Sequence, residues 1–164
     1  MVRIHITPLS AGIHHFSWDP APETLGLDPE VFQDVRVKAR LDVQGTQFLV
    51  ALEAAAVATL TCDRTLVPFD EAVSGTYTVL YVAPGFLEEA EGVDEDVRAL
   101  PPGEDEIDLT DAVRDTLLLA LPYRRVAPGA EDLDIPLRFG EPADADIDPR
   151  WEALRHLRPP DGRP

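Results

Sequence analysis

The hydrophobic residues of this chain alternate with polar residues over several stretches, and alternation is the pattern of a half-buried β-strand. It is clearest between positions 34 and 43, where charged residues separate five apolar ones: Val35, Val37, Ala39, Leu41 and Val43. Residues 44–46, Gln-Gly-Thr, then predict a compact turn. Phe48, Val50 and Leu52 continue the alternation, which indicates a second strand that pairs back antiparallel.

Further stretches predict more strands. Residues 54–58 are mostly alanine, which favours a helix, but their continuation into 59–62 favours a strand. Residues 76–82 are rich in β-branched and aromatic side chains, and the N-terminal stretches 2–6 and 13–18 predict two more strands. About six strands joined by short turns indicate a curved antiparallel sheet or a small barrel.

A helix is predicted between residues 110 and 121. Thr110 suits its N-cap, Asp111 suits its positive end, and Pro122 stops it. Its apolar face contains five residues: Val113, Leu117, Leu118, Leu119 and Leu121. Such a wide apolar face predicts a helix that packs into the core of an α+β domain.

Two stretches lack a regular pattern. Acidic residues crowd the region near 86–104, which predicts a loop or a disordered insertion. From Pro128 onward the chain is rich in Pro, Gly and Asp, and only residues 149–157 recover a helical pattern. We therefore expect one β-rich α+β domain over residues 1–140, followed by an acidic linker and a short C-terminal helix within 141–164.

Length and composition fit one ordinary domain with a sizeable core, because the chain has 164 residues of which 45% are hydrophobic. No apolar run approaches the roughly 20 residues that span a bilayer. The start of the chain lacks the pattern of a secretory signal. We expect a cytoplasmic protein without a membrane partner. The single cysteine, Cys62, excludes an internal disulfide.

The formal net charge of −17 restricts the partners. Affinity for nucleic acid comes largely from Lys and Arg that neutralise phosphates, so most of this surface repels RNA and DNA, and we expect no DNA partner. A basic protein partner fits the charge better, although a local cationic patch could still bind RNA. Lys38 is the only lysine, and an aspartate-rich, lysine-poor composition is also typical of adaptation to high salt. Both explanations of the charge stay open.

Several short segments occur along the chain in an order that can be compared with known protein families. Cys62-Asp63-Arg64-Thr65 closes an alternating strand and leads into Val67-Pro68-Phe69. The other segments are Gly12 to Phe16, Glu106 to Thr110, Leu117 to Pro122 and Asp148 to Leu154. This order resembles the YceD family of bacterial proteins. The family is associated with accumulation of large-subunit ribosomal RNA, so the resemblance implies a role in ribosome assembly and no enzymatic activity.

Metal binding is not expected. A structural zinc site normally needs four Cys or His ligands, and metal-binding members of the family are expected to have a second cysteine three residues after the first, plus a distal pair. Thr65 occupies the first of these positions, and residues 123–128 contain no cysteine. We predict that Cys62 is a small buried side chain, that hydrogen bonds of Asp63 or Thr65 hold its turn, and that the protein needs no cofactor.

Three arginines are the candidate contacts to RNA or another partner. Arg64 could grip a phosphate, or it could pair with Asp63 or Asp70. Arg124 and Arg125 follow the predicted helix and could complement its negative end. The resemblance implies that Arg64, Arg124 and Arg125 converge, because the family's two cysteine-bearing turns lie at these places.

The sequence contains no phosphate loop, nucleophile elbow or His-Glu-x-x-His pair, so we expect no enzyme. The leading hypothesis is a factor that supports accumulation of large-subunit ribosomal RNA by contacting precursor ribosomal RNA or a basic ribosomal protein. For the basic partner the candidate residues are acidic: Glu88, Glu89, Glu91, Asp94, Glu95 and Asp96. The alternative is a salt-adapted acidic protein-interaction module with no direct RNA role.

Overall fold

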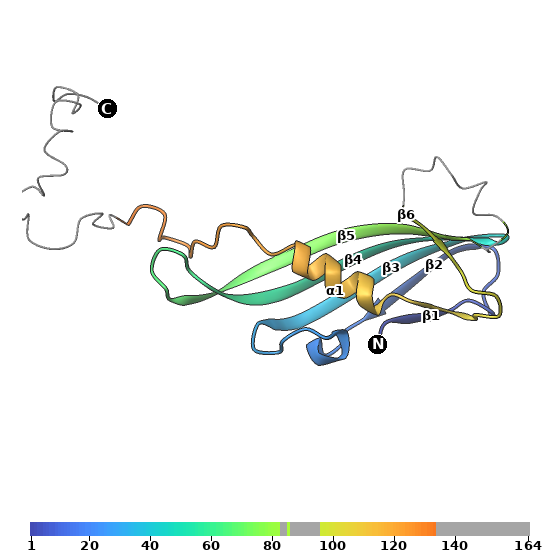
Figure 1. Cartoon of the computed structure of the whole chain (residues 1–164), viewed down its shortest axis with the longest axis horizontal. Helices are drawn as coiled ribbons and strands as arrows, with labels where there is room; N and C mark the ends of the chain where they lie inside the picture. The colour runs from blue at the N-terminus through green and yellow to red at the C-terminus, as the bar shows by residue number, and fades with distance from the viewer. Residues whose placement is uncertain (83–84, 86–95, 134–164) are drawn as a thin grey trace, which may run out of the picture. The chain divides into compact units, whose positions relative to one another are not determined.

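The structure is a computed structural model that describes residues 1–82, 85 and 96–133. By its internal contacts the chain divides into Met1–Asp132 and Leu133–Pro164, and the elements below belong to the first unit. They are β1 (Arg3–His5), β2 (Gly12–Trp18), the short 3-10 helix η1 (Pro22–Leu25), β3 (Phe32–Gln44), β4 (Gln47–Thr61), β5 (Pro68–Val82), β6 (Asp96–Ala99), β7 (Glu106–Asp108) and α1 (Thr110–Leu119) (Figure 1). The predicted boundary at residue 140 and the predicted C-terminal helix lie outside the described residues.

The body is a five-stranded sheet with the order β2-β3-β4-β5-β6. The first four strands are antiparallel neighbours, whereas β5 and β6 are parallel. A separate antiparallel pair joins β1 to β7. The sequence-based prediction of an α+β domain with a β-rich body is confirmed. The strand order is linear, with β2 and β6 at the two ends, so the described part of the chain forms a sheet and not the alternative closed barrel.

The alternating pattern of residues 34–43 lies within β3, where every second side chain is buried from Val35 to Val43. The predicted turn follows, with Gly45 at a φ of 62° that favours glycine. The alanine-rich run belongs to the single long strand β4, as its continuation into residues 59–61 indicated. The predicted strand at 76–82 is the second half of β5, which already begins at Pro68.

Helix α1 packs on one face of the sheet, which we call the inner face, against β4 and β5 (Figure 1). Val113 and Leu117 of α1 are fully buried there, together with the inward side chains of β3 and β4. Gly75 marks the closest approach: a Cβ at this position would lie 2.7 Å from Thr116 Cγ2 and 3.2 Å from the Thr116 carbonyl oxygen. A small residue on β5 therefore sets how closely the helix approaches the sheet.

Two details of the predicted helix are wrong. Thr110 is its first residue and not its cap; its Oγ1 accepts a hydrogen bond from the Val2 N–H at 3.1 Å, and the Asp108 carboxylate accepts the Thr110 N–H at 2.8 Å. The helix ends at Leu119, and the side chains of Leu118 and Leu119 are 45% and 86% exposed. They do not widen the core face, because only the side of α1 that contains Val113 and Leu117 faces the sheet.

The prediction of a loop near 86–104 is wrong for residues 96–99, which form β6 and pair with Val79–Val82 of β5. Two interactions stabilise β6 although it lies in an acidic segment. Val97 packs against Leu80 and Val82, and the edge of β5 supplies backbone groups for pairing. Residues 101–104 form a turn closed by the Glu104 N–H and the Pro101 carbonyl oxygen at 3.1 Å.

Candidate functional site: the Cys62 turn and the segment after the helix

The connection between β4 and β5 is a closed loop, which we call the Cys62 turn (residues 62–67). The Cys62 N–H donates to the Val67 carbonyl oxygen at 3.0 Å, and the Leu66 N–H donates to the Cys62 carbonyl oxygen at 2.9 Å. Leu66 has a φ of 58°, a left-handed conformation that is unusual for a leucine. Leu66 and Val67 are exposed, whereas the Cys62 side chain is fully buried.

The chain beyond α1, which we call the post-helix segment (residues 123–131), lies against this turn. The Asp63 N–H donates to the Arg125 carbonyl oxygen at 2.7 Å, and Asp63 Oδ2 accepts the Arg125 N–H at 2.8 Å. Of the two residues predicted to hold the turn, Thr65 acts within it, since its Oγ1 accepts the Val67 N–H at 3.5 Å, whereas Asp63 bonds a residue 62 positions away in the sequence. The two bonds between Asp63 and Arg125 join the segments that the family resemblance implied would meet.

The thiol of Cys62 takes part in the same junction. Its Sγ accepts the Ala127 N–H at 3.3 Å. Hydrogen bonds from the Thr65 side chain and then from the Ala127 backbone lower the pKa of the Cys62 thiol from 9.0 to about 7, against the opposing effect of burial. The sulfur thus satisfies a backbone donor of the post-helix segment, and the prediction of a small buried side chain is confirmed.

The junction does not fit a structural zinc ion. Among residues 1–82, 85 and 96–133, no three His, Cys, Asp or Glu side chains gather as ligands. The ring of His14 contacts the Ser10 carbonyl oxygen at 2.8 Å, and His5 Nδ1 lies 3.0 Å from Glu106 Oε1. Hydrogen bonds of Asp63 and Cys62 join the two segments instead.

The three predicted arginines take different positions at this junction. Arg64 Nη1 donates to the Glu131 carbonyl oxygen at 2.6 Å, and its side chain is half-buried. Arg125 meets the turn through its backbone, and both Arg124 and Arg125 are exposed. The chain positions of all three residues therefore converge, while their contact to RNA or to another partner stays a prediction.

Of the acidic residues predicted to bind a basic partner, Glu88, Glu89, Glu91, Asp94 and Glu95 lie outside the described residues. Asp96 is the first residue of β6, where its carboxylate accepts the Tyr77 hydroxyl and lies 3.2 Å from the Arg98 guanidinium. The hydrogen bond from Tyr77 holds the pKa of Asp96 below its usual value. This carboxylate is therefore engaged within the domain.

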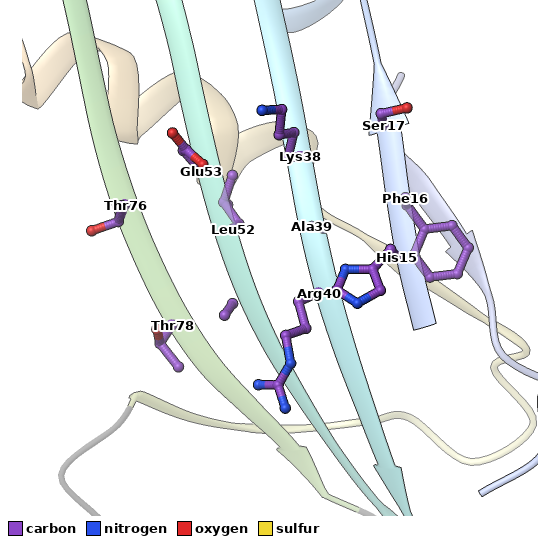
Figure 2. Close-up of a pocket in the computed structure, with 11 residues that line it drawn as sticks. His15, Phe16, Ser17, Lys38, Ala39, Arg40, Leu52, Glu53, Thr76 and Thr78 are labelled. Carbon is purple, nitrogen blue, oxygen red and sulfur yellow. The ribbon is translucent and has the colours of Figure 1, made fainter. Parts of the chain in front are cut away.

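A hollow that the sequence patterns did not predict lies on the outer face of the sheet, opposite α1. It has a volume of about 520 Å³ and is formed by strands β2 to β5. Its polar lining consists of His15, Ser17, Lys38, Arg40, Glu53, Thr76 and Thr78 (Figure 2). The sequence did contain the pattern that locates this face. In an alternating strand the apolar side chains face the core, so the polar side chains line the opposite, outer face.

Comparison with known proteins identifies the class of this β-sheet protein. The model of a family described as "Large ribosomal RNA subunit accumulation protein YceD" matches residues 50–158, which is more than half of the chain. The chain therefore belongs to the YceD family, as its sequence segments indicated. No curated protein and no solved structure matches it. The matched range includes most of β4, the Cys62 turn, β5, α1 and the post-helix segment.

Among the described residues, no helix is both long and apolar enough to cross a membrane.

Proposed function

We propose that this protein supports the accumulation of large-subunit ribosomal RNA as a cytoplasmic, non-enzymatic factor that contacts precursor ribosomal RNA. Membership of the YceD family is the observation that carries the proposal, because the family's description names this RNA and no reaction. The junction between the Cys62 turn and the post-helix segment lies within the matched residues. Arg124 and Arg125 are exposed there and are available to phosphates.

A basic ribosomal protein is the second candidate partner. The net charge of −17 favours it, because opposite charge speeds encounter and orients the partners. The acidic residues 88–96 would supply the contact. If the charge instead reflects a high-salt habitat, the protein is an acidic interaction module with no direct RNA role.

Affinity capture from native lysate, with and without ribonuclease treatment, separates these candidates. Recovery of large-subunit RNA and proteins only from untreated lysate would support contact through RNA. Recovery of the same basic ribosomal proteins from both samples would support the protein partner. Capture of neither large-subunit component would contradict the proposed function.

Two variants sharpen this comparison. Replacing Arg64, Arg124 and Arg125 with Gln should reduce recovery of RNA if the junction contacts it, and should leave recovery of a basic protein unchanged or higher. Replacing the six acidic residues of 88–96 with their amides should have the opposite effect. A capture profile that neither variant alters would remove both sets of residues as contacts.

A further inference from the structure

The cations of the described residues are unevenly distributed, and one strand holds a row of them. Arg36, Lys38 and Arg40, which we call the β3 cations, occupy alternate positions of β3 and are all exposed on the outer face. Successive members lie about 7 Å apart along the strand, because each residue of an antiparallel strand rises about 3.4 Å. They form a linear array of positive charge on a chain with a net charge of −17.

Two of these cations have no carboxylate partner within the described part of the chain. Ion pairs there involve Arg3, Arg98 and Arg114 at 3.0 to 3.3 Å, and Arg40 lies 3.8 Å from Asp42. Arg36 and Lys38 make no ion pair with any described residue. Arg3, Arg98 and Arg114 thus have their charges neutralised locally, whereas Arg36 and Lys38 do not; Arg124 and Arg125 likewise make no ion pair with a described residue.

The neighbours of the β3 cations on the outer face include small and hydroxyl-bearing side chains, together with His15 and Glu53. Arg40 lies beside His15 on β2 and Ala51 on β4, and Arg36 lies beside Ala55. Lys38 lies between Ser17 and Glu53, and the row continues to Thr76 on β5. Small side chains leave room above the sheet, where there is a hollow of about 520 Å³; Figure 2 shows the residues that line it.

From this arrangement we infer that the outer face of the sheet binds the sugar-phosphate backbone of an RNA strand along β3. The inference rests on the proposed function and specifies where RNA binds. Arg36, Lys38 and Arg40 would contact successive phosphates, since Arg and Lys neutralise phosphate charge. Glu53 would repel a phosphate but is a good acceptor for a ribose 2′-hydroxyl, the group that distinguishes RNA from DNA.

The rest of the surface strengthens this assignment. A chain with a net charge of −17 repels nucleic acid over most of its surface, so RNA would bind where cations gather; the outer face holds the β3 cations together with the carboxylates of Asp42, Glu53 and Asp70. The two aromatic rings of β2, Phe16 and Trp18, alternate with His15 and Ser17 and pack against the core. The aromatic rings that line the outer hollow, those of His15 and Phe16, both lie on β2, so base stacking would be confined to that side of the hollow and we expect weak sequence preference.

The test is fluorescence anisotropy with the full chain and a fluorescein-labelled single-stranded oligoribonucleotide at several salt concentrations. Three phosphate contacts to a single strand give a slope of about −2 for log affinity against log salt, so a fourfold rise in salt lowers affinity about twentyfold. Replacing Arg36, Lys38 and Arg40 with Gln should flatten the slope to near zero. Their exposure predicts an unchanged thermal melt, which checks that the variant is folded.

Single substitutions provide a matched control. Lys38→Gln and Arg114→Gln change the net charge equally, but Arg114 lies on α1 and pairs with Asp111 and Asp115. We expect Lys38→Gln to reduce the salt slope by about 0.7 and Arg114→Gln to leave it unchanged. Glu53→Ala should raise affinity for the matching oligodeoxynucleotide more than for the oligoribonucleotide, because it removes both the repulsion and the 2′-hydroxyl acceptor.

The outcomes distinguish the inference from the proposed function. An unchanged salt slope in the triple β3 variant, or no RNA binding by the wild-type chain at low salt, would overturn the inference. Loss of binding only in the Arg64, Arg124 and Arg125 variant would place RNA at the junction instead. Equal losses in Lys38→Gln and Arg114→Gln would show that only net charge matters. The proposed function is tested separately, by the amount of large-subunit RNA in cells.

Discussion

Gly75→Ala tests the close packing of α1 on the sheet. The post-helix segment follows α1 in the chain, so this packing also places that segment beside the Cys62 turn. The new Cβ would lie 2.7 Å from Thr116 Cγ2, closer than real Cβ contacts, and 3.2 Å from a backbone oxygen that only a movement of the helix can displace. Overpacking of this kind costs about 1–3 kcal/mol. Loss of glycine's freedom in the unfolded chain offsets about 0.4–1 kcal/mol. We expect a net destabilisation of about 1–2 kcal/mol in urea unfolding.

A second substitution isolates the cause. Thr116→Ser removes Cγ2 but keeps the hydroxyl that donates to the Ala112 carbonyl oxygen at 2.7 Å. In that background Gly75→Ala should cost about 1 kcal/mol less than in the wild type, a coupling typical of residues in contact. Gly85→Ala is the control, because a Cβ there meets no atom within 4 Å. The reasoning is refuted if Gly75→Ala is neutral or costs the same in both backgrounds.

Three further predictions concern the Cys62 turn and the charge. We expect no stoichiometric zinc by elemental analysis and a folded Cys62→Ser variant; one zinc per chain that the variant loses would contradict this. Because the thiol pKa is lowered to about 7 from 9.0, its contribution to stability is present above pH 9 and is lost as pH falls through 7. The unfolding free energy of wild type relative to Cys62→Ser should therefore rise between pH 7 and 9, and a constant difference would refute the assignment. Added sodium chloride should raise the melting temperature by screening repulsion among Asp and Glu, whereas a steady fall would show that specific ion pairs dominate.

Local sequence patterns predicted the strands whose own residues alternate between buried and exposed positions. The alternation of 34–43 identified β3, and the continuation of the alanine run identified β4 as a strand. β6 could not be predicted this way, because its pairing depends on the edge of β5 and on a single apolar contact through Val97. Threonine is a common N-cap residue, but the hydroxyl oxygen of Thr110 accepts a hydrogen bond from the Val2 N–H instead. Sequence patterns could not show this contact, because the two residues are 108 positions apart.

The same distinction applies to the candidate site. Residue type predicted that Asp63 or Thr65 would hold the Cys62 turn, but only the family resemblance placed the post-helix segment beside it. The β3 cations were visible in the sequence, yet they became a site only when β2 placed His15 and Ser17 beside them and β4 placed Glu53 and two alanines beside them. Alternation defines which face a residue occupies, whereas the strand order decides what lies beside it.

The role of the outer face in RNA accumulation can be measured as the ratio of large-subunit to small-subunit ribosomal RNA in cells that lack this protein. We expect that the ratio falls, that wild-type protein and Arg114→Gln restore it, and that the variant with Arg36, Lys38 and Arg40 replaced by Gln does not. Restoration by that triple variant would remove the outer face as the RNA contact while leaving the function in place. An unchanged ratio in cells without the protein would contradict the function itself.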